Sequence, residues 1–147
     1  MRKMIQWVMA ATLVCGMSVF TSCSSDDDDK VQVQILDFKV AAADWEEYFA
    51  NSYETYVEVP QITKEIFEHG NVSVSMEVDE DSTKNYFSLP AFFTDDYGEG
   101  DSITFFNKYY DFVWREGLIV LSYCSDDAKS TIEPEDVTFR VFITNYK

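Results

Sequence analysis

Short runs of alternating apolar and polar residues recur along residues 31–147 and constrain the fold more than any other feature. Val72–Val78 shows the pattern most clearly, with valine or methionine at every second position and Ser73, Ser75 and Glu77 between them. Side chains of a β-strand point alternately to its two faces, so such a run predicts a strand with one wet face. The other predicted strands are residues 31–40, 53–59, 86–89 with 91–93 as its continuation, 102–114, 118–124 and 137–146.

Turn signals separate these runs every 8–14 residues, and almost no helix is expected. One short helix is predicted over residues 64–69, with Thr63 as its N-cap and Gly70 in the left-handed position that closes it. Glu116-Gly117 predicts a tight turn between two strands. Seven or eight short strands predict an all-β domain, a single antiparallel β-sandwich that is Ig-like or related to that arrangement.

Several segments are less clearly patterned. Residues 79–85, 94–101 and 125–136 are expected to be loops, and the long strand over residues 102–114 has a potential break near residues 107–108. Residues 41–49 fit either a helical turn or a strand that continues past a bulge, and the sequence leaves both readings open.

The first 22 residues predict a targeting signal. Arg2 and Lys3 precede an apolar run over residues 5–20, which is shorter than the roughly 20 residues that a transmembrane helix needs. Phe20-Thr21-Ser22-Cys23 resembles a bacterial lipobox, with Phe20 where leucine is commoner. The resemblance implies that signal peptidase II cuts before Cys23 and that its sulfur carries a diacylglycerol. The alternatives are an uncleaved anchor and an ordinary secreted protein.

An acidic run follows the cysteine directly. Residues 23–30 contain four consecutive aspartates, which cannot form a core and predict a short solvated tether to the domain at residues 31–147. Acidic residues at this place resemble the export signal of Bacteroidota lipoproteins. That resemblance implies an outer-membrane protein whose lipid anchor is its membrane contact and which faces the cell exterior; a periplasm-facing lipoprotein is the alternative.

The charge balance restricts the partners. Residues 1–22 carry two cations and no acid, so without them 9 Lys and Arg face 27 Asp and Glu, a net charge of about −18. Nucleic acid is excluded as a partner because its phosphates would be repelled. Cys124 is the remaining cysteine of the domain, so no disulfide can form within it, and an apolar neighbourhood predicts a buried, inert thiol.

A second resemblance spans most of the domain. The residues that carry it are core and turn positions, so it implies a fold and an address but no catalytic residue. The chain is similar to small, uncharacterised Bacteroidota lipoproteins with β-domains at Trp45, Tyr56–Thr63, Ile66, Gly70, Val72, Val74, Leu89-Pro90 and Phe139–Ile143.

Aromatic residues are the first candidates for a binding site. Eleven lie between Tyr86 and Trp114, several of them as adjacent pairs. Neighbouring residues of a strand point to opposite faces, so one member of each pair must leave the core side. Such side chains either pack under loops or form an exposed platform for a sugar or a partner. Residues with a flat face and a polar group favour a platform, and the candidates are Trp45, Tyr97, Tyr110 and Trp114.

The acidic loop over residues 95–101 is the second candidate. Asp95, Asp96, Glu99 and Asp101 could supply oxygen ligands to a weak Ca²⁺ site, although the EF-hand pattern fails and a solvated turn is the alternative. No other cofactor and no metal is expected, because the chain has a single histidine and no HExxH motif.

No catalytic set is recognisable. His69 ends the predicted helix, where a cation favours the helix dipole, and no pair of carboxylates is singled out for glycoside hydrolysis. Asp81-Ser82-Thr83 and Asp101-Ser102-Ile103 resemble the Asp-Ser/Thr-apolar acceptor for O-glycans in Bacteroidota, which implies Ser82 and Ser102 as modification sites.

The sequence therefore predicts a cell-envelope lipoprotein that carries a non-enzymatic binding or interaction module. A glycan or another envelope protein is its expected partner. The alternative is a structural or assembly subunit of a surface complex or fimbria, which would use the pairing of sheet edges.

Overall fold

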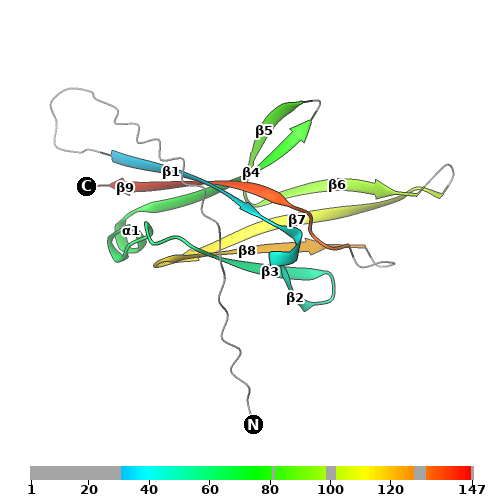
Figure 1. The fold of residues 1–147 in the computed structure, drawn as a ribbon, viewed down its shortest axis with the longest axis horizontal. Coiled ribbons are helices and arrows are strands. Elements are labelled where there is room, and N and C mark those ends of the chain that lie inside the picture. The colour runs from blue at the N-terminus through cyan, green and yellow to red at the C-terminus, as the bar shows by residue number, and fades with distance from the viewer. Residues whose placement is uncertain (1–30, 81, 99–101, 128–131, 147) are drawn as a thin grey trace, which may run out of the picture.

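A computed structural model of the chain describes residues 31–80, 82–98, 102–127 and 132–146. Within them the chain forms a 4-stranded sheet A, in the order β1-β9-β4-β5, and a 5-stranded sheet B, in the order β2-β3-β8-β7-β6 (Figure 1). The elements are β1 (Val31–Val40), η1 (Ala42–Asp44), β2 (Glu46–Phe49), β3 (Ser52–Glu58), α1 (Lys64–His69), β4 (Asn71–Glu80), β5 (Thr83–Ser88), β6 (Ala91–Tyr97), β7 (Thr104–Arg115), β8 (Leu118–Ser125) and β9 (Val137–Tyr146).

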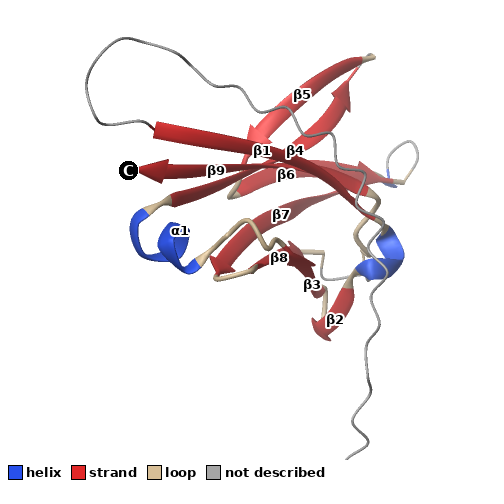
Figure 2. Ribbon diagram, turned by 60° about the vertical axis from the view of Figure 1, so that its left-hand side comes forward, coloured by secondary structure: helices blue, strands red, loops and turns tan. Residues whose placement is uncertain are grey.

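The two sheets pack face to face, with every neighbouring pair of strands antiparallel. Figure 2 shows the two layers of strands, with α1 and the 3-10 turn η1 toward opposite ends. Alternate residues of both sheets fill the space between them, and Phe139, Leu121 and Ile119 are fully buried there. Burial of these side chains supplies the main driving force for folding. The prediction of an all-β antiparallel sandwich with one short helix is confirmed.

Helix α1 closes one end of the sandwich. The Thr63 hydroxyl accepts a hydrogen bond from the Ile66 amide, which confirms the predicted N-cap. The prediction that Gly70 adopts the left-handed conformation is wrong, because its backbone is extended, with a φ of −97°. A Cβ at Gly70 would lie 2.6 Å from the Thr144 carbonyl oxygen and 2.8 Å from that of Ile66. Glycine is required here by the close approach of α1 to β9, and not by a turn.

Two segments expected to be loops are strands. Residues 79–80 end β4 and residues 83–85 begin β5, and these two strands pair as a hairpin. Residues 94–97 belong to β6, and β7 continues through residues 107–108 without a break. Residues 86–93 are not one interrupted strand, because β5 and β6 lie in different sheets.

The remaining predicted elements match with small shifts. Of the two readings of residues 41–49, the helical turn is confirmed by η1, whereas β2 is a separate short strand of sheet B and not a continuation of β1 past a bulge. The Glu116-Gly117 turn joins β7 and β8, with Gly117 at a φ of 72° that a side chain rarely adopts. No helix of the described segments is long and apolar enough to cross a bilayer. The signal peptide, Cys23 and the tether over residues 23–30 lie outside the described residues.

Candidate functional site

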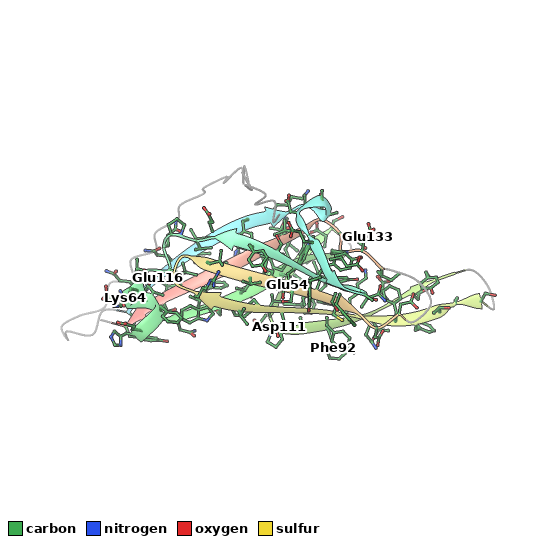
Figure 3. All side chains as sticks on the ribbon, turned by 90° about the horizontal axis from the view of Figure 1, so that it is seen from below. Glu54, Lys64, Phe92, Asp111, Glu116 and Glu133 are labelled. Carbon is green, nitrogen blue, oxygen red and sulfur yellow. The ribbon has the colours of Figure 1, made fainter. Side chains whose placement is uncertain are left out.

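The outer face of sheet B carries a group of exposed aromatic side chains. Phe92 on β6 lies directly opposite Tyr109 on β7, and their rings are stacked with centroids 6.4 Å apart at 28°. Phe105, two pairs further along the same strands, is 70% exposed. Figure 3 shows Phe92 pointing away from the ribbon. We call Phe92, Phe105 and Tyr109 the platform.

The platform arises from adjacent aromatic pairs that the strands divide between the two faces. Phe106 and Tyr110 of β7 are buried against the core side, so their neighbours Phe105 and Tyr109 must face water. Phe93 likewise packs against the core while Phe92 is 69% exposed. The prediction that one member of each pair leaves the core is confirmed.

Hydrogen bonds fix the backbone and polar groups beside the platform. The Thr94 hydroxyl donates to Asn107 Oδ1 at 2.9 Å, and Asn107 Nδ2 donates to Asp126 Oδ2 at 2.7 Å. The backbone N–H of Asn107 also donates to Asp126. The two hydrogen bonds from Asn107, first that of its backbone N–H and then that of its side chain, hold the pKa of Asp126 below its usual value. The platform is therefore bordered by an ordered amide and an ionised carboxylate.

The face around the platform is acidic. Strand register places six carboxylates on or beside it against one cation, Arg115. The carboxylates belong to Glu46, Glu54, Glu58, Asp96, Asp111 and Asp126, of which Glu54 and Asp111 are labelled in Figure 3. An anionic ligand would be repelled from this surface, whereas hydroxyl groups and cations can be bound.

The aromatic residues named from the sequence do not form this surface. Trp45 and Tyr110 are buried in the core, where Trp45 contacts both Tyr110 and Tyr123 edge to face. Burial raises the pKa of Tyr110. The expectation that these two side chains are exposed is wrong, because both lie on the inner side of the sandwich. Half-buried Trp114 is also an inner-face residue and packs edge to face on Phe67.

Tyr97 is exposed, and its ring is tilted against that of Phe106 with centroids 5.8 Å apart. It is not brought together with Trp45, Tyr110 or Trp114 into one site.

A sequence signal for the platform was available in the register of the β7–β8 hairpin. A two-residue turn places Arg115 opposite Leu118, so odd positions of β7 oppose even positions of β8. Ile119, Leu121 and Tyr123 show that the odd face of β8 is the apolar one, which assigns even positions of β7 to the core. Tyr109, and not Tyr110, then faces outward.

Cys124 was predicted to be buried, and this is wrong. Its side chain is exposed on the outer face of β8, opposite Tyr109, because it has the parity of Ser122. The Ser52 hydroxyl lies 3.5 Å from its sulfur. The apolar run that suggested burial belongs to the opposite face of the same strand.

The acidic segment does not gather its carboxylates. Asp95 points to the inner side and pairs with Lys108 Nζ at 2.6 Å, whereas Asp96 belongs to the outer face. These two side chains cannot share one ion from opposite faces of β6, and Glu99 and Asp101 lie outside the described residues. The described segments contain no cluster of three metal-ligating side chains.

Among the ion-paired cations of the described segments, Lys108 has the least exposed side chain. It also lies 3.2 Å from Glu135 and 5.7 Å from the centre of the Phe106 ring. Burial opposes the charge of Lys108, but hydrogen bonds to Asp95 and Glu135 outweigh it and raise the pKa of the amine. These ion pairs have a structural role, because they connect the segment that precedes β9, through Glu135, to β6 and β7 of sheet B.

Ser82 and Ser102 are both exposed. Ser82 lies in the turn between β4 and β5 with a φ of 65°. The aspartates that precede the two serines, Asp81 and Asp101, lie outside the described residues, so modification at either serine stays a prediction. His69 ends α1 with an exposed side chain, and its Nε2 lies 4.0 Å from the Glu68 carboxylate.

A polar network covers the outer face of sheet A. Arg140 on β9 donates to both carboxylate oxygens of Asp37 at 2.7 and 2.8 Å and lies over the Tyr86 ring at 4.2 Å. Glu77 accepts hydrogen bonds from Lys84 and Tyr86. Hydrogen bonds from Arg140 hold the pKa of Asp37 below its ordinary value of 3.8. This bidentate pair joins the edge strand β1 to β9.

Replacement of Arg140 by methionine should lower stability in a pH-dependent way. The depressed pKa of Asp37 means that the pair stabilises the fold above about pH 3.8 and that this contribution is lost as the pH falls through the folded-state value. Both groups are partly exposed, so the loss at pH 7 should be at most about 1 kcal/mol. Urea unfolding of both proteins at pH 7 and pH 3 should show the difference shrinking in acid. A difference that is independent of pH would mean that contact with Tyr86, and not the ion pair, is the stabilising interaction.

Comparison of the chain with protein families, curated proteins and solved structures finds no match.

Proposed function

We propose that this chain is a cell-envelope lipoprotein whose sandwich is a non-enzymatic binding module, with the outer face of sheet B as its carbohydrate-binding surface. The observation that carries the proposal is the stacked Phe92–Tyr109 pair, with exposed Phe105 four residues along β7 on the same face. Soluble proteins rarely leave such groups of aromatic rings in water without a partner. A sugar ring can lie on these flat apolar faces while its hydroxyl groups bind the polar border.

The surrounding charges indicate the class of glycan. Asp126, Asp111 and Asp96 offer carboxylate acceptors for hydroxyl groups or for an amino group. Uronic or sialylated glycans would bring like charges to this face and should bind more weakly. The proposed ligand is therefore a neutral or amino-sugar polysaccharide.

Loss of either stacked ring should weaken binding about tenfold, which corresponds to roughly 1.4 kcal/mol of stacking free energy. The test is titration calorimetry of the full chain and of Phe92→Ala and Tyr109→Ala against a panel of neutral, amino and anionic polysaccharides. Val113→Ala is the matched control, because Val113 is 63% exposed on the same strand and face but lies beyond the part of β7 that pairs with β6, on the side of Tyr109 away from Phe105.

Two results would contradict this proposal. One is the absence of binding to every neutral and amino polysaccharide in the panel. The other is a ligand whose affinity is unchanged by both Phe92→Ala and Tyr109→Ala, which would place its site elsewhere.

The anchor belongs to the same proposal. A lipid on Cys23 and the acidic residues 26–29 would hold the module on the outer membrane, facing the exterior, without further membrane contact. The alternative function, an assembly subunit that pairs sheet edges, is favoured by the properties of strand β1.

A further inference from the structure

Strand β1 is a free edge of sheet A. It is ten residues long and pairs with β9 on one side, while no described strand pairs with its other side. Free edges invite other strands, and proteins usually protect them with charge, proline or shortness. The other edges follow this rule: β2 has four residues including Glu46 and Glu47, β5 has six with Lys84, and β6 carries Asp95 and Asp96.

The first six residues of β1 lack any such protection. Val31–Leu36 contains no charge, proline or glycine, and consists of valine, isoleucine, leucine and glutamine. Segments of six or seven residues with high β-propensity and low charge are the ones that pair most readily with other strands. The unprotected edge is therefore confined to the N-terminal part of β1, before Asp37 and Lys39.

The polarity of this part of β1 is reversed relative to the rest of the sandwich. Val31 is 55% exposed on the outer face opposite exposed Tyr146, and Val33 is also exposed. Gln32 and Gln34 instead line a pocket of about 160 Å³ on the inner side. Valines on the solvent side of an edge strand gain stability when a further strand covers them.

Charge determines which partner can approach. The acids on the outer face of sheet A are largely neutralised within the face, by Arg140 on Asp37 and by Lys84 on Glu77, and Lys39 is paired with Asp136 at 2.6 Å. The outer face of sheet B, in contrast, has six carboxylates against one cation. A second copy of this strongly acidic chain would be repelled at sheet B, whereas the described outer face beside β1 is nearly balanced. The unbalanced charge near β1 is that of Asp26–Asp29, which precede the strand in the sequence.

We propose that β1 is an interface between two copies of this chain, paired antiparallel about a two-fold axis so that two sheets A become one continuous sheet. Alternation requires outer-face residues to face outer-face residues across the new pair. One residue must then oppose its own copy, and pairing that retains the uncharged segment places Val33, Gln34 or Ile35 at the axis. A contact made by one short strand segment from each copy should be weak in solution. Anchoring both copies in one membrane would raise their effective concentration.

Disulfide trapping of the full chain in membranes tests this interface. In a Cys124→Ser background, which removes the exposed thiol, cysteine is placed at position 33, 34 or 35 by Val33→Cys, Gln34→Cys or Ile35→Cys. We expect oxidation to give a disulfide-linked dimer with at least one of the three, well above the background protein. Val113→Cys is the control, because Val113 is exposed on the acidic face.

Sedimentation of the detergent-purified full chain gives a second measurement. We expect Val33→Lys to weaken self-association at least tenfold and Val113→Lys to leave it unchanged. Trapping in membranes at positions 33–35 no stronger than at 113 would overturn the proposal, as would self-association that Val33→Lys weakens no more than Val113→Lys does. An adduct of β1 with a different protein would also overturn it, by assigning the edge to a heterologous strand.

Discussion

A Phe139→Ala protein is expected to lose about 3–5 kcal/mol of its free energy of unfolding. Phe139 lies on β9 in the interior of sheet A and is 0% exposed. Its ring stacks on Phe38 with centroids 5.8 Å apart and tilts against Trp45 at 6.4 Å. Alanine would leave a cavity between the two sheets that these rings cannot fill without leaving their own positions.

The size of this effect is large relative to the total. Domains of this kind are stable by about 5–15 kcal/mol, so the variant should unfold at a much lower urea concentration or should not accumulate. Phe92→Ala is the matched control, since it makes the same chemical change at a side chain that is 69% exposed. Its stability should change by no more than about 0.5 kcal/mol. Similar losses for the two variants would mean that the assignment of the two aromatic faces is wrong.

Strands with one wet face were predictable from the sequence. Val72, Val74 and Met76 of β4 are buried, and serines stand between them, as the alternation indicated. The same holds for β9, where Phe139 and Val141 are buried. In such strands one face contacts the core and the other contacts water, so apolar and polar residues alternate along the sequence.

Strands without a fully buried face do not show this alternation, so the sequence does not predict them. The tip of the β4–β5 hairpin reaches away from the body of the molecule, so neither of its faces is fully buried (Figures 1 and 2). Its residues are consequently polar on both sides and look like a loop. The carboxylates and glycines of residues 94–101 predict a loop, yet Asp95 lies in β6. Its inward carboxylate pairs with Lys108 on the neighbouring strand, 13 positions away.

The sequence predicts that the strands expose aromatic side chains, but it does not predict which ones. Strand alternation correctly required exposed aromatics, but residue type was a poor guide to which member of a pair is exposed. Tyr110 was favoured for its hydroxyl, yet register buries it and exposes Tyr109. The stacking of Phe92 on Tyr109 depends on the β6–β7 register, which no turn signal in residues 98–103 determines.

A Cys23→Ala protein is expected to incorporate no labelled palmitate and to be lost from the outer-membrane fraction. The proposed lipidation uses the sulfur of Cys23, and each buried CH₂ of an acyl chain contributes about 0.8 kcal/mol to membrane binding. One chain holds a protein only reversibly, whereas the two or three of a mature lipoprotein hold it stably. The expected change is therefore close to all or none, in contrast to the graded effects of substitutions in the sandwich. Fractionation and metabolic labelling measure it, and the mass of the wild-type N-terminus should show an acylated Cys23.

Cys15→Ala and Cys124→Ser are the controls for this experiment. Cys15 lies within the proposed signal peptide and Cys124 is on the outer face of β8, so both variants should keep the label and the location. A wild-type protein with an unmodified Cys23, or a Cys23→Ala protein that keeps its label, would contradict the anchor. The proposed carbohydrate surface on sheet B and the proposed β1 interface do not depend on that outcome, because both are argued from described residues between 31 and 146. Only the gain in effective concentration at β1 would be lost with the anchor, leaving the weak solution affinity of the strand edge itself.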